Sequence, residues 1–269
     1  MITEMIRKFR QKLKDGPVLG PFSKTEDPAM VEAMGYAGFD FLILDLEHGP
    51  NTVRSLQNLV RAAQLSGILP IVRVKEDLPN VIGEALDIGA GGVQVPKITT
   101  AEDARAVIQT AKFAPLGMRG VCCAVRAAEY GAKDRFEYFR EANEALVILQ
   151  LESRTALENA KDIIRVPGID IIFVGPYDLS QSLGVIGQTD HPDVAAMFRE
   201  IAGICAQNNI AVGTYVETPQ AAAKWSALGA RYLCYKVDTA IMLNASRQIV
   251  NEFAGMALSS RGKSDGNET

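Results

Sequence analysis

Short apolar segments with the length of β-strands alternate with amphipathic segments along this chain of 269 residues. Eight such apolar segments are recognised, and each is followed by a stretch with the apolar spacing of an α-helix. A strand, a helix and a second parallel strand form the repeating unit of parallel sheets, and eight of these units close into a barrel. The sequence therefore predicts an α/β fold of the (β/α)8 TIM-barrel type.

The expected elements cover most of the chain. Strands are expected at residues 18–22, 39–45, 69–74, 92–96, 146–152, 170–175, 210–215 and 232–237. Helices are expected at residues 27–36, 53–66, 79–88, 100–111, 155–164, 192–208, 219–228 and 239–253, with an extra N-terminal helix at 6–14. Thr155 before Glu158 fits a capping box at a helix start, and glycines such as Gly38 and Gly229 are expected to end helices.

The length of the chain would allow one domain or two, and the composition does not decide between them. A chain of this length with 48% hydrophobic residues can bury a large core, and single α/β barrels commonly have this size. We expect one domain over residues 1–258 and a disordered polar tail over residues 259–269.

Charge and apolar patterning exclude several classes of function. The net charge is −4 and the pI is near 5.4, and no Lys/Arg cluster is interleaved with aromatic residues, so nucleic-acid binding is not expected. No apolar run approaches the roughly 18 residues that a membrane span requires. The four cysteines form no C-x-x-C pair and are interpreted as reduced thiols. We expect a cytoplasmic protein that acts on small molecules.

Ionisable side chains directly follow three of the apolar segments. Asp45, Glu47 and His48 follow the second expected strand, Glu152 follows the fifth and Asp178 follows the sixth. Because the carboxyl ends of the strands of a parallel barrel converge on one mouth, these groups should surround one cavity. This arrangement is typical of an enzyme.

Glu152 and Asp178 are candidate metal ligands. They lie one barrel repeat apart, at the ends of neighbouring strands. Two carboxylates with open positions suit Mg²⁺ or Mn²⁺, with water and substrate oxygens completing the ligand sphere. The alternative at each position is a helix cap or a surface ion pair.

Four basic residues need separate interpretations. His48 follows Asp45 closely, and an imidazole held by a carboxylate moves protons near neutral pH, whereas His191 before a proline is expected to cap a helix or lie on the surface. Arg73 is embedded in an apolar strand, so it either meets a structural carboxylate or, as we favour, holds a substrate oxyanion. Lys97 either forms a salt bridge, which is favoured, or a Schiff base.

Five short motifs, in this order, resemble those of the HpcH/HpaI aldolase family, the metal-dependent pyruvate aldolases. They lie at residues 44–51 (LDLEHGPN), 119–121 (RGV), 150–153 (QLES), 175–180 (GPYDLS) and 237–239 (VDT). The resemblance extends from about residue 10 to residue 255. It implies a TIM barrel of the phosphoenolpyruvate/pyruvate-binding type, assembled as a homo-oligomer, often a hexamer, in which the last helix is exchanged between subunits.

The resemblance also implies roles for individual residues. Glu152 and Asp178 would bind the metal, Arg73 would steady the enolate oxygen, and His48 with Asp45 would relay the proton. The pyruvate pocket would be lined by Gln150, Gly175, Pro176, Tyr177 and Phe22. Tyr177 stands where the family usually has a small residue, a difference that affects the size of the pocket.

The expected activity is that of a class II pyruvate aldolase, a carbon–carbon lyase. With Mg²⁺, Mn²⁺ or Co²⁺ as cofactor, it would reversibly cleave a 4-hydroxy-2-oxo acid to pyruvate and an aldehyde. The alternative is another lyase acting through the pyruvate enolate, such as an oxaloacetate decarboxylase or an acyl-CoA lyase, which needs the same metal site without a strong aldehyde-side proton relay. A barrel that only binds a ligand would not need Asp45, Glu47 and His48 together.

Overall fold

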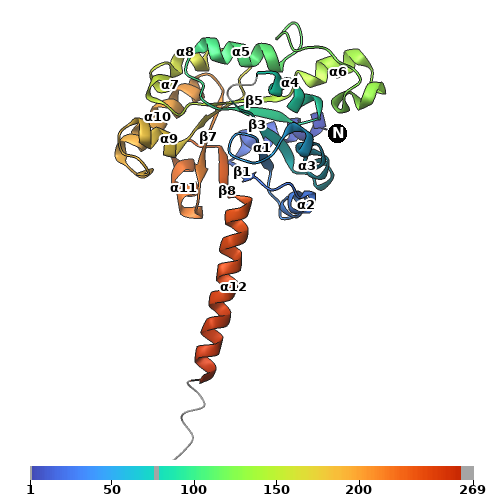
Figure 1. Ribbon diagram of the computed structural model, residues 1–269. Coiled ribbons are helices and arrows are strands. Elements are labelled where there is room, and N and C mark those ends of the chain that lie inside the picture. The colour runs from blue at the N-terminus through green and yellow to red at the C-terminus, as the bar shows by residue number, and fades with distance from the viewer. Residues whose placement is uncertain (1, 76–78, 262–269) are drawn as a thin grey trace, which may run out of the picture.

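Eight parallel strands form a closed barrel in the order β1 to β8, surrounded by helices (Figure 1). This computed structural model describes residues 2–75 and 79–261, without the side chains of Pro79 and of residues 256–261. The strands are β1 (Val18–Ser23), β2 (Phe41–Asp45), β3 (Leu69–Arg73), β4 (Gly92–Val95), β5 (Leu146–Gln150), β6 (Ile171–Val174), β7 (Ala211–Val216) and β8 (Tyr232–Val237). All eight expected strands are confirmed, with bounds that differ by no more than a few residues.

The helices follow the expected alternation, with additions. They are α1 (Ile2–Asp15), α2 (Pro28–Tyr36), α3 (Val53–Ser66), α4 (Pro79–Asp87), α5 (Ala101–Ala111), the 3-10 helix η1 (Arg126–Gly131), α6 (Arg135–Ala142), α7 (Arg154–Glu158), α8 (Ala160–Ile164), α9 (Pro176–Ser182), α10 (Pro192–Gln207), α11 (Pro219–Ala227) and α12 (Asp238–Arg261). Three of these, η1, α6 and α9, were not expected from the sequence.

Three expectations about helix ends need comment. The single helix expected at 155–164 is two short helices, and the cap of the first is Ser153, which accepts from the backbone N–H of Ala156, so the Thr155 capping box is wrong. His191 does cap α10, because its ring accepts from the backbone N–H of Asp193. The expected domain boundary at residue 258 falls inside α12; the tail expected from 259 is helical to 261, and residues 262–269 lie outside the described residues.

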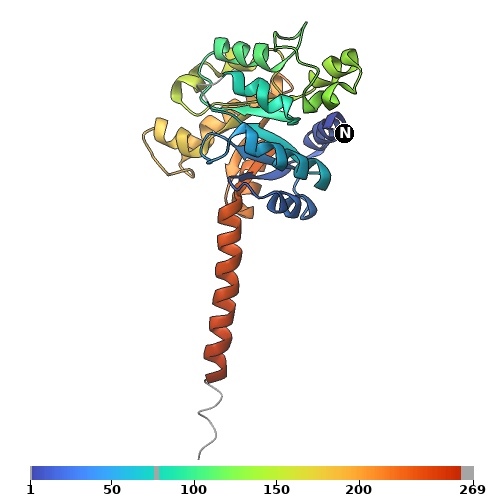
Figure 2. The ribbon, with the colours of Figure 1, turned by 45° about the vertical axis from the view of Figure 1, so that its right-hand side comes forward.

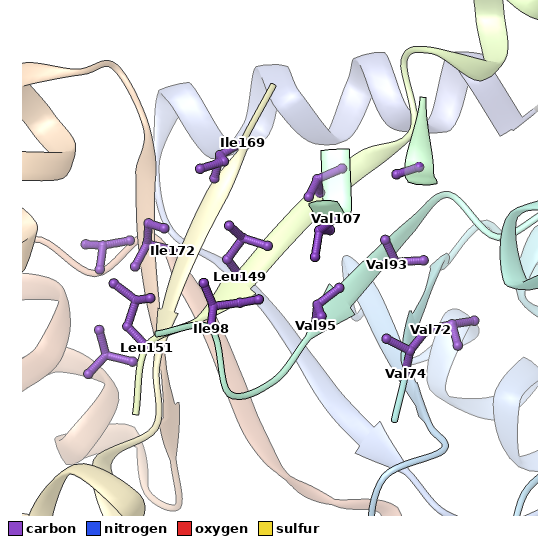
Figure 3. Close-up of a cluster of buried hydrophobic side chains, with 14 of the residues drawn as sticks. Val72, Val74, Val93, Val95, Ile98, Val107, Leu149, Leu151, Ile169 and Ile172 are labelled. Carbon is purple, nitrogen blue, oxygen red and sulfur yellow. The ribbon is translucent and has the colours of Figure 1, made fainter. Parts of the chain in front are cut away.

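The strands carry two apolar faces. The side chains that point outward pack against the surrounding helices in one buried cluster, of which Figure 3 labels Val72, Val93, Val95, Leu149 and Ile172 on the strands and Val107 on α5. The side chains that point inward fill the barrel and include Phe41, Ile43, Leu69, Ile71, Leu146, Ile148, Ile171, Phe173 and Tyr232. Because both faces are buried, the strands read as continuous apolar runs rather than as alternating ones.

Two aromatic rings fill the amino-terminal part of the barrel. Phe41 and Tyr232 stack with their ring centroids 4.2 Å apart, and Phe9 of α1 contacts Phe41 edge-on at 5.8 Å. These rings fit because glycines face them. A Cβ atom on Gly20 would lie 2.7 Å from the Phe41 ring, and one on Gly213 would lie 2.6 Å from the Tyr232 ring. Helix α1 therefore closes the end of the barrel that is opposite to the mouth.

Helix α12 projects away from the barrel, as both views show (Figures 1 and 2). Its main contacts with the body are with β1 and β8, at its first turns. Large apolar side chains along it are exposed, among them Met242, Leu243, Ile249, Val250 and Phe253. Within the described part of the chain, no helix combines the length and apolar character needed to cross a bilayer.

Gly20→Ala should strongly destabilise the barrel. The added methyl would press against both the carbonyl oxygen and the ring of Phe41, and neither can retreat from the packed interior. We expect a loss on the order of 3 kcal/mol in the free energy of unfolding, measured by urea denaturation. Gly16→Ala is the matched control, because a Cβ there meets nothing within 4 Å. Equal stability of the two variants would contradict the packing described here.

Candidate active site

Three of the functional side chains, those of Asp45, Arg73 and Gln150, occupy inward-facing positions at the carboxyl ends of their strands, and the others follow in the segments just beyond. Along β2 the inward positions are Phe41, Ile43 and then Asp45; along β3 the same alternation ends at Arg73. Glu152 lies two residues beyond Gln150, the last residue of β5. The pleat that packs the apolar interior thus also delivers polar groups to the mouth.

Arg73 is bound by two carboxylates. Its Nε and Nη2 atoms donate to Asp45 Oδ1 and Oδ2 at 2.8 and 2.7 Å, and its Nη1 lies 3.1 Å from Glu47 Oε2. The guanidinium also lies over the ring of Phe22, 4.6 Å from its centroid. The structural carboxylate that was the alternative for Arg73 is therefore present, although the guanidinium still lines the cavity at the mouth.

Asp45 holds the β2–α3 loop rather than the His48 ring. Besides Arg73, its carboxylate accepts from the backbone N–H groups of Glu47 at 3.0 Å and His48 at 3.3 Å. The His48 side chain is 65% exposed, and its Nε2 lies 3.9 Å from Glu47 Oε2. The expectation that Asp45 orients the imidazole directly is thus wrong: the acidic neighbour of the ring is Glu47, which the sequence placed at the mouth of the barrel without a catalytic role.

Burial and charge shift the pKa values of these carboxyl groups in opposite directions. Burial disfavours the ionised form of Asp45, but the hydrogen bonds and positive charge of Arg73 outweigh it and lower the pKa of Asp45. At Glu47, desolvation by burial prevails over the attraction of Arg73, so its pKa is raised. Arg73 and Asp45 therefore form a charged pair, whereas burial disfavours the ionised form of Glu47 beside them.

Glu152 and Asp178 converge on Gly175. A Cβ atom on Gly175 would lie 3.3 Å from Asp178 Oδ2 and 3.4 Å from Glu152 Oε2. Asp178 stands in the first turn of α9, whose first residue is Pro176. Desolvation raises the pKa of Glu152, and repulsion from Asp178 and Glu47 adds to it. Two carboxylates that repel each other across a space without a side chain are an arrangement that a cation would stabilise.

A cavity of about 310 Å³ lies between these groups. Its lining includes the five predicted pocket residues, which are Phe22, Gln150, Gly175, Pro176 and Tyr177, together with His48, Arg73, Glu152 and Asp178. Asp45 is fully buried behind Arg73 and does not line it. Sequence reasoning thus brought together most of the residues that line the cavity.

Four lining residues were missed, namely Lys24, Phe173, Tyr215 and Val237. The first three each continue an inward-facing series, because they lie two residues after Phe22, Ile171 and Gly213. The period of two along a strand was the signal that would have found them. The ammonium group of Lys24 is 4.0 Å from Asp45 Oδ2, longer than a hydrogen bond. The hydroxyl of Tyr177 donates to Glu217 at 2.9 Å across the rim.

Lys97 lies beside the cavity rather than in it. Its backbone N–H donates to Glu152 Oε1 at 3.0 Å, and the residue has a positive φ of 57°. It lines a neighbouring cavity of about 560 Å³ that shares Glu152 with the first. The backbone of Lys97 therefore helps to orient Glu152.

Fold and site together define a class of enzyme. A closed parallel barrel, with paired carboxylates beside a buried arginine at its mouth, is suited to stabilising negative charge on a small oxygen-rich substrate. The chain belongs to the HpcH/HpaI aldolase/citrate lyase family, whose model matches residues 19–245.

Individual relatives cover nearly the whole chain. It is 36% identical to the 2-dehydro-3,6-dideoxy-6-sulfogluconate aldolase of Pseudomonas putida, over 88% of this chain and 92% of that protein. It is 35% identical to a hydroxypyruvate/pyruvate aldolase of Roseobacter denitrificans, over 91% of this chain and 96% of that protein. A crystal structure of a family member from Burkholderia cenocepacia superimposes with a TM-score of 0.86 at 33% identity, covering 92% of this chain and 99% of that one. These comparisons confirm the predicted barrel, family and aldolase class.

Asp45→Asn should destabilise the protein by about 3 kcal/mol, because it removes the carboxylate that accepts two hydrogen bonds from the buried guanidinium of Arg73 and leaves Glu47, at 3.1 Å, as its nearest counter-charge. Thermal or urea unfolding at pH 7 measures the loss. Glu4→Gln, which removes a carboxylate from an exposed ion pair with Lys8, is the control and should change little.

The pH dependence gives a second test of the same pair. The pKa of Asp45 is lowered from 3.8 on folding, so its contribution to stability is present above that value and is lost as the pH falls through the folded-state pKa. The stability difference between wild type and Asp45→Asn should therefore shrink only below about pH 4. A difference that shrinks already between pH 7 and pH 5 would contradict the lowered pKa.

Proposed function

We propose that the chain is a class II pyruvate aldolase, which uses a divalent cation to cleave a 4-hydroxy-2-oxo acid reversibly into pyruvate and an aldehyde. The observation that carries the proposal is the convergence of Glu152 and Asp178 on Gly175, beside the guanidinium of Arg73 in one cavity. Relatives of matching length are named as aldolases, one of them for hydroxypyruvate and pyruvate. The geometry of the cavity and the names of the relatives therefore support the same class of reaction.

The donor set fits a hard divalent cation such as Mg²⁺, Mn²⁺ or Co²⁺. Glu152 and Asp178 offer carboxylate oxygens, and within the described residues no third His, Cys, Asp or Glu side chain joins them into a larger ligand cluster. Such a site leaves positions open for water and for the oxygens of a 2-oxo acid. A bound cation would supply Lewis-acid polarisation of the keto oxygen.

Arg73 and Gln150 would hold the keto acid. The guanidinium is fixed by Asp45 and Glu47 before substrate arrives, so it offers positive charge without reorganisation as the enolate oxygen becomes negative. Gln150 donates to Glu152 Oε2 at 2.9 Å and lines the same cavity. The acceptor aldehyde would lie toward Phe22, Tyr177 and Tyr215, which form the aromatic wall of the cavity.

His48 would move the proton. Its ring stands at the mouth of the cavity with Glu47 as its nearest carboxylate, and imidazole is the side chain best suited to accept and return a proton near neutral pH. In the cleavage direction it would take the proton from the C4 hydroxyl. In the reverse direction, aldol addition, it would take a proton from the methyl group of pyruvate. Asp45 would contribute by fixing the loop that carries His48.

The working form would be a homo-oligomer in which α12 packs on a second copy of the chain. The helix is 24 residues long, so it extends roughly 36 Å, and its apolar side chains face solvent in the single chain. Exposed apolar surface of this kind marks an interaction site. A hexamer with exchanged C-terminal helices, which the family resemblance implies, would cover it.

Carbon–carbon bond formation should depend on the cation. Protein incubated with pyruvate, Mn²⁺ and a panel of aldehydes should yield 4-hydroxy-2-oxo acids, detected by mass spectrometry, and EDTA should abolish the product until Mg²⁺, Mn²⁺ or Co²⁺ is added back. Glu152→Gln and Asp178→Asn should lose Mn²⁺ binding in calorimetry while circular dichroism stays unchanged. Glu158→Gln, at an exposed position of α7, is the control.

Full activity in a verified metal-free sample would refute the metal site. Decarboxylation of oxaloacetate or cleavage of an acyl-CoA thioester, without any aldol product, would favour the alternative lyases that use the same enolate.

His48→Ala should lower turnover by about 10²-fold, the usual contribution of a positioned general base. Binding of pyruvate should persist, because the groups that would hold it are unchanged. The control is His191→Ala, which removes the cap of α10 and should leave turnover intact. Near-native turnover of His48→Ala would exclude the imidazole from the proton transfer.

Ile249→Glu combined with Phe253→Glu should dissociate the oligomer. The two residues are four apart on α12 and both are exposed in the single chain, so charge there would be buried only at an interface. Light scattering after gel filtration should show a lower mass than for the wild type. Asn251→Asp, a polar change on the same stretch of helix, should keep the wild-type mass, and a monomeric wild type would contradict the assembly.

A further inference from the structure

A chain of hydrogen bonds runs from the middle of the barrel to Glu152. The Tyr232 hydroxyl donates to Gln94 Oε1 at 3.2 Å, Gln94 Nε2 donates to Gln150 Oε1 at 2.5 Å, and Gln150 Nε2 donates to Glu152 Oε2 at 2.9 Å. The exposed fractions of Tyr232, Gln94 and Gln150 are 0%, 0% and 2%. Three strands, β8, β4 and β5, contribute these three residues.

Filling the barrel interior does not require polar side chains at the positions of Gln94, Gln150 and Tyr232. Nearby inward-facing positions are apolar, such as Ile43, Ile71 and Ile148. Burying an amide is unfavourable unless its hydrogen bonds are made, and an apolar side chain at position 94 would avoid that cost. The barrel thus carries two buried amides and a phenol where aliphatic residues would fill the space.

The carboxylate of Glu152, at one end of this series of hydrogen bonds, determines which group donates in every bond of the series. An ionised carboxylate only accepts, so Gln150 must turn its NH₂ group toward Glu152 and its oxygen toward Gln94. Gln94 must then give its own NH₂ group to Gln150, which leaves its oxygen toward Tyr232. The Tyr232 hydroxyl is the donor that this oxygen requires.

Cys234 also contacts the Tyr232 hydroxyl, but it does not change this order. The hydroxyl has one proton, and an amide oxygen is a much stronger acceptor than a thiol sulfur. The proton therefore goes to Gln94, and the thiol can donate to the hydroxyl oxygen. Each hydrogen bond of the series can therefore form with only one donor–acceptor direction. Exchanging the oxygen and the NH₂ group of either Gln94 or Gln150 by a half-turn of the amide would break two hydrogen bonds.

We propose that Gln94 and Tyr232 are positioning residues, which lock the amide of Gln150 with its NH₂ group toward Glu152 and the substrate cavity. The consequence for catalysis rests on the proposed function, because it assumes that Glu152 holds the cation and that a 2-oxo acid binds beside it. Without the lock, the Gln150 oxygen can face Glu152, where it repels the carboxylate and withdraws a donor from the cavity that Gln150 lines.

Three variants separate positioning from mere structural support. Gln94→Met removes the donor to Gln150 at similar volume but leaves the Tyr232 hydroxyl without its amide acceptor. Tyr232→Phe removes the far donor. The double variant Gln94→Met/Tyr232→Phe also removes the hydroxyl that the single Gln94→Met variant leaves without its acceptor, so it should recover part of the thermal stability that the single variant loses.

The readouts are the dissociation constants of Mn²⁺ and of pyruvate in the presence of Mn²⁺, measured by calorimetry, with KM and kcat alongside. We expect Gln94→Met to weaken pyruvate binding about tenfold and Tyr232→Phe to weaken it a few-fold, in line with loss of a buried hydrogen bond. The double variant should bind pyruvate as weakly as Gln94→Met although its stability is recovered. Thr214→Val, which removes a buried hydroxyl bonded to the carbonyl of Val174, is the control and should lose stability alone.

Wild-type affinities in the stabilised double variant would overturn the inference, since the residues would then serve packing only. If the wild type binds Mn²⁺ and pyruvate but forms no aldol product, the proposed function is refuted. The binding measurements on the variants would still test whether Gln94 and Tyr232 position Gln150. A wild type that binds neither ligand would overturn both.

Discussion

The inside of a closed eight-stranded barrel has room for few side chains, and every strand sends alternate residues into it. This restriction governs the rest of the molecule. Phe41 and Tyr232 occupy the interior only because Gly20 and Gly213 offer no side chain opposite them. Above the apolar layers the same alternation continues to the mouth, where the inward positions carry ionisable groups instead. The same strands therefore build both the core and the site. If a strand shifted by one residue, its site residue would point outward, toward the surrounding helices, instead of into the mouth.

The mouth divides its carboxylates into two kinds. Asp45 is neutralised by Arg73 and serves the architecture of the loop. Glu152 and Asp178 repel each other instead, and a cation between them would relieve that repulsion. Glu47 is a fourth carboxylate at the mouth, and it lies near both the guanidinium of Arg73 and the ring of His48. The site thus holds one charge pair fixed and another pair in need of positive charge, within a single cavity.

Local patterns identified the strands, most of the helices and the carboxylates at the strand ends, because burial and strand length leave a direct mark on the sequence. They failed where a distant contact decides the local structure. The expected helix over 155–164 divides at Asn159, whose side chain donates to the carbonyl of Thr99. In the same way, nothing in the segment around Asp45 says that its carboxylate meets Arg73 rather than the His48 ring. Helix α9 is a different case. Proline is common at the first position of a helix, so Pro176 indicated that a helix begins there, but the segment was interpreted only as a binding motif.

Gly175 has an ordinary extended backbone, with φ −72° and ψ 107°, so any residue could adopt its conformation. What excludes a side chain is the space, because a methyl group there would meet both Asp178 and Glu152 and push their oxygens outward by a few tenths of an ångström. Mg²⁺ accepts only a narrow range of oxygen distances, whereas the larger Ca²⁺ tolerates longer ones. If the two carboxylates hold the proposed cation, the absence of a Cβ atom at Gly175 would set how small an ion they can close upon, and the choice of ion would depend on backbone spacing as much as on the ligands themselves.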